Sequence, residues 1–143
     1  MRAMILWLAV AGTSACAVDS AIIEQSGSTN SSGFRIVVEK SGKANYTPVA
    51  AKSGRQTDAA KPQSKQITSD LAGRFFSDLG AAGNLSDLPK PRCMKSASFG
   101  TTLTVELGGQ KSPDLSCGDG GNARLKALIQ DTNDIVSSFS TGP

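Results

Sequence analysis

The sequence contains no histidine, and aromatic and charged residues are scarce, at 5% and 19% of the chain. Histidine is the commonest general base and the commonest metal ligand in proteins, so its absence removes Ser-His-Asp chemistry and most zinc-ligand sets. The composition also excludes an all-apolar membrane bundle, a coiled coil, a cysteine-dense scaffold and a charge-driven disordered chain. A length of 143 residues leaves room for one small domain.

The N-terminus has the three parts of an export signal. Residues 1–17 begin with Met1 and Arg2, continue through an apolar run from Ala3 to Gly12, and end in small residues. The apolar run is too short to span about 30 Å of hydrocarbon, and no polar residue interrupts it. We therefore predict a signal peptide rather than a membrane helix or a core helix, and an extracytoplasmic location for the mature protein.

Two processing routes share the residues at the end of this signal. Cleavage after the A-x-A site at Ala15 to Ala17 would leave Val18 as the N-terminus and release a free protein. The same residues resemble a bacterial lipoprotein signal, which implies lipidation of Cys16, although Thr13 stands where that family places Leu, Val or Ile. We favour free export, and lipidation at Cys16 is the alternative.

The two cysteines beyond the signal form an even pair. In an oxidising compartment, Cys93 and Cys117 are expected to form a structural disulfide. A redox or zinc role would need a C-x-x-C spacing, a histidine or a third thiol, and the sequence after the signal contains none of these. We therefore predict the disulfide Cys93–Cys117, no metal site and no cofactor.

Composition divides the rest of the chain into a tether and a folded part. Residues 18–33 end in a run of Ser, Gly, Thr and Asn, which predicts a flexible tether. We predict a single α+β domain over 34–139 and a disordered tail over 140–143. Within the domain, residues 51–66 are basic and carry little apolar surface, so they are expected to be a solvated loop.

Two hairpins are predicted from apolar and polar alternation. In the first, a three-residue loop that closes at Gly42 places Val38 opposite Ala44 and Ile36 opposite Tyr46, which matches the apolar residues of both strands.

The second hairpin has a half-buried strand over 103–107. Its return strand over 110–115 is polar and contains Pro113, which predicts a position at the sheet edge.

Two amphipathic helices follow the hairpins. The first is predicted over 69–82, and the second begins after the N-cap Asn122 and runs to Phe139. The second helix has an apolar stripe over four turns, and its opposite face is predicted to include Asp131 and Asp134.

The predicted fold is α+β, with a four-stranded antiparallel sheet from two β-hairpins and two amphipathic helices packed on one face, in the order ββαββα. This layout resembles small exported bacterial proteins of uncharacterised function that share the repeated hairpin and helix. The resemblance covers about residues 34–139, rests on pattern rather than on a motif, and implies no activity.

The residues that could carry chemistry form no complete set. The glycine-rich segment before the last helix lacks the pattern of a phosphate-binding loop. Asp114, Asp119 and Asn122 are oxygen ligands, but their spacing departs from a calcium loop. Glu39 and Glu106 could form an acid and base pair on neighbouring strands, yet both fall on the polar positions of the alternation.

The preferred function is a non-catalytic exported domain that binds a protein partner or supports the cell envelope. The basic residues Lys90, Arg92 and Lys95 surround Cys93 and are the candidate partner contacts. The second hypothesis is a secreted inhibitor of an extracellular enzyme that acts through loop 89–95, and the third is an unrecognised hydrolase. The modest net charge of +3 argues against nucleic acid, and a membrane contact is expected only through a lipid at Cys16.

Overall fold

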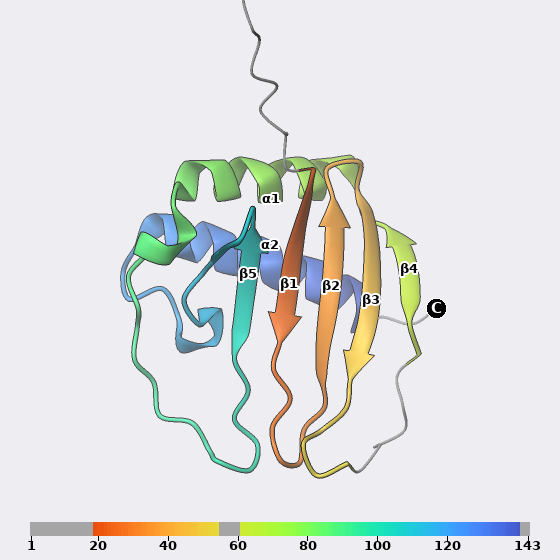
Figure 1. The fold of residues 1–143 in the computed structure, drawn as a ribbon. Helices are drawn as coiled ribbons and strands as arrows, with labels where there is room; N and C mark the ends of the chain where they lie inside the picture. Colours follow the sequence, from red (N-terminus) through yellow and green to blue (C-terminus); the bar gives the residue numbers. More distant parts are fainter. Residues whose placement is uncertain (1–18, 55–60, 141–143) are drawn as a thin grey trace, which may run out of the picture.

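The computed structural model describes residues 19–54 and 61–140, which form a six-stranded antiparallel sheet with two helices packed on one face (Figure 1). The strand order is β4-β3-β2-β1-β5-β6. The strands are β1 (Ser20–Gln25), β2 (Gly33–Glu39), β3 (Lys43–Val49), β4 (Gln63–Gln66), β5 (Leu103–Leu107) and β6 (Gln110–Lys111). The helices are α1 (Ser69–Ala82) and α2 (Ala123–Ser140), with short 3-10 helices η1 (Leu85–Asp87) and η2 (Leu115–Cys117). The predicted signal peptide with Cys16, and residues 141–143, lie outside the described residues.

The α+β class is confirmed, but the predicted tether over 18–33 is wrong. Six of its residues form β1, which lies between β2 and β5 and pairs with both. Ala21 and Ile23 on this strand are fully buried in the core. The short alternating strand was missed because the residues that follow it are rich in Ser. With β1 and a further strand, β4, added to the four predicted strands, the described sheet has six strands and does not follow the repeated ββα order.

The Ser-rich residues after β1 form an ordered hairpin loop. The amide of Ser26 donates to the carbonyl of Thr102 at 2.9 Å, and the amide of Lys52 donates to the carbonyl of Ser28 at 2.9 Å. Ser28 is 3% exposed, and its hydroxyl donates to the carbonyl of Ser98 at 2.8 Å. Hydrogen bonds to neighbouring loops therefore order a segment that has too little apolar surface to fold by hydrophobic burial.

The predicted register of the first hairpin is confirmed. Val38 pairs with Ala44, and Ile36 pairs with Tyr46. Gly42 in the turn has a φ of 86°, a conformation that glycine adopts without the strain a Cβ atom would cause.

Both edges of the sheet are short and polar. Residues 63–66 of the predicted solvated loop form the edge strand β4, where the Ser64 hydroxyl donates to Asn45 Oδ1 at 2.8 Å. An edge strand has one side open to solvent, so its sequence needs no apolar residues and its loop-like composition was misleading. The other edge strand, β6, is confirmed as a polar return strand, although it ends at Lys111 before Pro113.

Both helices lie where the sequence predicts them. The Thr68 hydroxyl accepts the amide of Leu71 at 3.3 Å and caps α1, and Asn122 caps α2. Helix α2 ends at Ser140, so the first residue of the predicted tail is helical. The placement of Asp131 on the outer face is also wrong, because this carboxylate is 3% exposed and faces α1.

Among the described helices, none has the length and apolar character needed to cross a membrane.

Candidate functional site

The candidate site is the segment 88–102 between η1 and β5, which we name the anchored loop. It contains no helix or strand, and it passes beside η2. The Sγ atoms of Cys93 and Cys117 are 2.02 Å apart, with their Cα atoms 5.2 Å apart, so the predicted cysteine pairing is confirmed. The disulfide joins the middle of the loop to η2.

A second attachment of the anchored loop is electrostatic. The Lys95 ammonium group contacts the carboxylate of Asp114, and it also donates to the hydroxyl of Ser116 and the carbonyl of Thr101. Lys95 was predicted as a partner contact, but its charge is paired with Asp114 at the start of η2. No local pattern in the sequence predicts this contact, because Asp114 and Ser116 lie 19 and 21 residues away from Lys95.

Asp114 is surrounded by hydrogen-bond donors. Burial alone would raise the pKa of its carboxyl group, but hydrogen bonds from Lys95, Ser116 and the amide of Leu103 outweigh burial and lower the pKa below its ordinary value. The donors at Oδ1 are the Leu103 amide at 3.0 Å, the Ser116 amide at 3.1 Å and the Ser116 hydroxyl at 2.7 Å. The ionised carboxylate therefore joins the anchored loop, β5 and η2.

The three residues considered as calcium ligands all make local contacts. Asp114 holds Lys95, Asp119 accepts the amide of Gly121 at 2.8 Å, and Asn122 accepts the amide of Leu125 at 3.0 Å. Each of the three candidate ligands is used in a local structural contact. Over residues 19–54 and 61–140, no three His, Cys, Asp or Glu side chains are grouped to hold a metal ion.

The anchored loop presents apolar and basic side chains to solvent. Met94 is fully exposed, and Phe99 is 65% exposed. Lys90 and Arg92 are also exposed, and neither forms an ion pair within the described part of the chain. The two basic residues were predicted as partner contacts, whereas Met94 and Phe99 were not. An apolar residue within a polar, proline-containing loop is the sequence feature that could have indicated them.

A tight turn holds Phe99 in place. The amide of Gly100 donates to the carbonyl of Ser96 at 2.7 Å, and the Ser96 hydroxyl accepts the amide of Phe99 at 3.3 Å. A Cβ atom at Gly100 would lie 2.4 Å from the Ser96 carbonyl oxygen, so this turn requires glycine. Behind the turn, the carbonyl of Ser98 accepts hydrogen bonds from the β1–β2 loop, at the lower end of the sheet in Figure 1.

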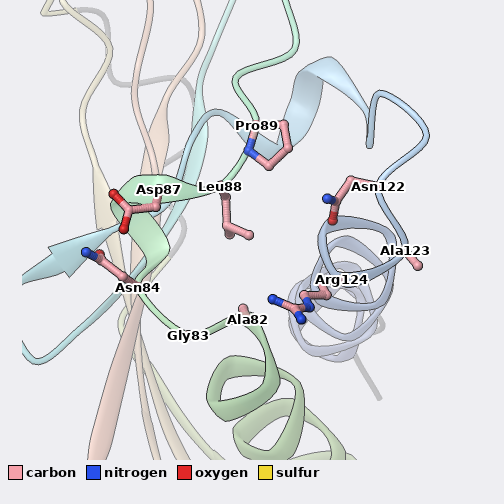
Figure 2. A pocket seen from close by; sticks show the side chains of 9 residues that line it. All are labelled: Ala82, Gly83, Asn84, Asp87, Leu88, Pro89, Asn122, Ala123 and Arg124. Carbon is pink, nitrogen blue, oxygen red and sulfur yellow. The ribbon is translucent and has the colours of Figure 1, made fainter.

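A cleft of about 510 Å³ lies between η1 and the first residues of α2 (Figure 2). Pro89 of the anchored loop lines it, together with Arg124 from α2 and Asp87 from η1. The side chains of Asn84 and Asn122 also line the cleft, but they cap η1 and α2. The Oδ1 atoms of both Asn side chains are therefore used at the helix ends, and the two charged side chains that line the cleft are of opposite sign.

A second polar cluster joins the two helices, and we name it the helix-pair cluster. Arg74 Nη2 of α1 lies 3.1 Å from Asp131 Oδ1 and 3.2 Å from Asp134 Oδ2 of α2. The other oxygen of Asp131 is buried without a hydrogen-bond donor among the described residues. Burial raises the pKa of Asp131 above its ordinary value, and the neighbouring Asp78 carboxyl raises it further, against the opposing effect of Arg74.

The two glutamates considered as an acid and base pair are not on neighbouring strands. Glu39 pairs with Ser20 of β1, whereas Glu106 pairs with Ile22 of β1 and with Lys111 of β6. Strand β1 lies between their two strands, so the sheet separates these carboxylates.

The anchored loop thus combines a covalent attachment, an ion pair and exposed side chains of the kinds that protein interfaces favour. No protein-family model and no curated protein matches this sequence, so its function is argued from the residues themselves.

Proposed function

We propose that this chain is an exported, non-catalytic module that binds a protein partner through the anchored loop. The observation that carries the proposal is the full exposure of Met94 and the 65% exposure of Phe99 on an ordered loop. Met, aromatic residues and Arg are enriched at protein interfaces, whereas Lys is depleted there. Arg92, two residues before Met94, therefore fits the composition of a binding surface better than Lys90 does.

Two features support an extracytoplasmic location. The disulfide between Cys93 and Cys117 is typical of proteins that fold in oxidising compartments, and the predicted signal peptide would direct the chain there. Mass spectrometry of the mature N-terminus separates the two processing routes. A chain that begins at Val18 is freely exported, whereas a diacylglycerol group on Cys16 identifies a lipid-anchored protein.

A binding role is favoured over catalysis because the residues available for acid and base chemistry are separated or occupied. The sequence lacks histidine, β1 separates Glu39 from Glu106, and Arg74 pairs with Asp131. A turnover that disappears when Glu39 or Glu106 is changed to Gln would overturn the non-catalytic proposal.

Partner capture with matched variants tests the binding surface. The wild-type chain is immobilised with its disulfide intact and exposed to the exported proteins of its own source. We expect the double variant Met94→Ser and Phe99→Ser to lose a protein that the wild type retains reproducibly. Val49→Ser is the control, because Val49 is 43% exposed on β3, and strands β2 and β1 lie between β3 and β5. Equal retention by the double variant and the wild type would contradict the proposal.

A further inference from the structure

Arg92 occupies a special position within the anchored loop. It lies in the irregular segment 89–95, and its side chain is exposed. The residues on both sides of it are attached to the rest of the domain by different means. Because the backbone is attached on both sides of Arg92, this exposed basic side chain is presented to solvent on a restrained segment.

The attachment before Arg92 is made by packing. Leu88 is 7% exposed and belongs to the hydrophobic core, and Pro89 lines the cleft beside α2. The ring of Pro91 lies over Gly120, where an added Cβ atom would be 3.3 Å from Pro91 Cγ. The two prolines also fix their own φ angles near −65°, which limits the conformations available to the backbone before Arg92.

The attachment after Arg92 is covalent and electrostatic. Cys93 is bonded to Cys117 of η2, and two residues later the Lys95 ammonium group contacts Asp114 and Ser116. The backbone on this side of Arg92 is therefore held to the same 3-10 helix at two points.

We propose that Arg92 enters the specificity pocket of an arginine-cleaving serine protease, and that the anchored loop inhibits such an enzyme. This inference rests on the proposed binding function and names the class of its partner. A carboxylate at the base of such a pocket recognises a guanidinium group with two parallel hydrogen bonds. A loop that is already held at both ends loses little conformational freedom when it binds, which strengthens the complex.

The neighbouring basic residues are less suited to this role. Lys90 is exposed, but the next residue is Pro91, so the peptide bond after Lys90 has no N–H group. Lys95 is held by Asp114 and is not presented to a partner. Arg92 combines an exposed cationic side chain with an ordinary secondary peptide bond to Cys93.

The two attachments also explain why the loop would act as an inhibitor rather than as a substrate. Hydrolysis after Arg92 adds one water molecule across the peptide bond and leaves a carboxylate at Arg92 and an amine at Cys93. Packing of Leu88 and Pro91 retains the first end, and the disulfide to Cys117 retains the second. Neither product end leaves, so the enzyme stays occupied.

Inhibition of purified trypsin by the oxidised full-length chain tests this inference. We expect tight, saturable inhibition by the wild type, a loss of at least about 100-fold in affinity for Arg92→Ala, and retention within about tenfold for Arg92→Lys. Lys90→Ala is the matched control, and its inhibition should stay within about twofold of the wild type. Arg92→Phe should transfer inhibition from trypsin to chymotrypsin, whose pocket is apolar.

Three results would overturn the inference. They are a wild-type chain that leaves trypsin active, an Arg92→Ala variant that inhibits as well as the wild type, and cleavage after Arg92 at the rate of an unstructured peptide. Intact mass and circular dichroism establish that each variant is folded and oxidised. Partner capture that depends on Met94 and Phe99 would survive each of these failures, so the test distinguishes this inference from the general binding function.

Discussion

Asp114, which caps η2 and holds the anchored loop through Lys95, and Asp131 in the helix-pair cluster both contact a basic side chain, yet their pKa values shift in opposite directions. Asp114 is surrounded by donors from Lys95, Ser116 and the backbone, which stabilise its ionised form. Asp131 is more deeply buried and has a second carboxyl group, Asp78, beside it. Burial and a second carboxyl group thus raise the pKa of Asp131 in spite of its cation, whereas several donors outweigh burial at Asp114 and lower the pKa there.

The two sites therefore respond to acid in opposite ways. The lowered pKa of Asp114 contributes stability above the ordinary pKa of 3.8, and that stability is lost as the pH falls through the lower folded value. The raised pKa of Asp131 favours the folded state at acidic pH, and that advantage is lost as the pH rises through the folded value. Mild acid should strengthen the helix contact while the loop attachment remains, and strong acid should weaken the loop attachment.

The largest effect is expected from removal of the disulfide. Changing Cys93 and Cys117 together to Ser should lower the free energy of unfolding by roughly 3–4 kcal/mol, because the unfolded chain gains freedom when the loop is opened. Urea unfolding of the wild type with and without reductant provides the check. The reduced wild type and the double variant should have the same free energy of unfolding. A double variant as stable as the oxidised wild type would show that the disulfide does not stabilise the fold.

A smaller loss of stability is expected at Asp114, the carboxylate that holds Lys95 of the anchored loop. Asp114→Asn keeps an oxygen that accepts backbone amides but removes the charge opposite Lys95, so stability should fall by about 1–2 kcal/mol near neutral pH. In strong acid, the stability of this variant should fall less than the stability of the wild type. Urea unfolding at several pH values measures both, with Asp119→Asn as the control within about 0.5 kcal/mol of wild type. An unchanged acid profile would contradict the role given to Asp114.

The smallest effect is expected at the buried carboxylate, and it has the opposite sign. Asp131→Asn keeps an acceptor for Arg74 and adds an N–H donor toward Asp78, so stability near neutral pH should rise by about 0.5–1.5 kcal/mol. The gain should shrink as the pH falls, because the wild-type carboxyl group then acquires its own donor. Asp134→Asn is the exposed control, and a loss of stability at neutral pH in Asp131→Asn would contradict the explanation.

Local signals in the sequence predicted most of the secondary structure. Asn122 provides a helix cap, and Gly42 fixes the register of the first hairpin. The pairing of Cys93 with Cys117 followed from the even number of cysteines beyond the signal. Each of these features depends on neighbouring residues or on simple counting, so no knowledge of the tertiary fold was needed.

The errors concern features that depend on distant residues. Strand β1 is short and precedes a Ser-rich loop, and its central position follows from pairing with β5, about 80 residues later. Strand β4 is polar because it lies at an edge. Asp131 is buried because Arg74, 57 residues earlier, reaches it from α1. The candidate site also depends on distant residues. Lys95 of the anchored loop pairs with Asp114, which leaves Lys90 and Arg92 as the candidate partner contacts.

The most direct test of this comparison is a carbon-13 NMR titration of the side-chain carboxyl groups in the oxidised chain. One experiment reports both sites, because each aspartate gives its own midpoint. The account predicts that Asp114 titrates below the ordinary value of 3.8 and that Asp131 titrates above it. Equal midpoints for the two groups, or the reverse order, would contradict both the ion pair that holds the anchored loop and the buried acid between the helices.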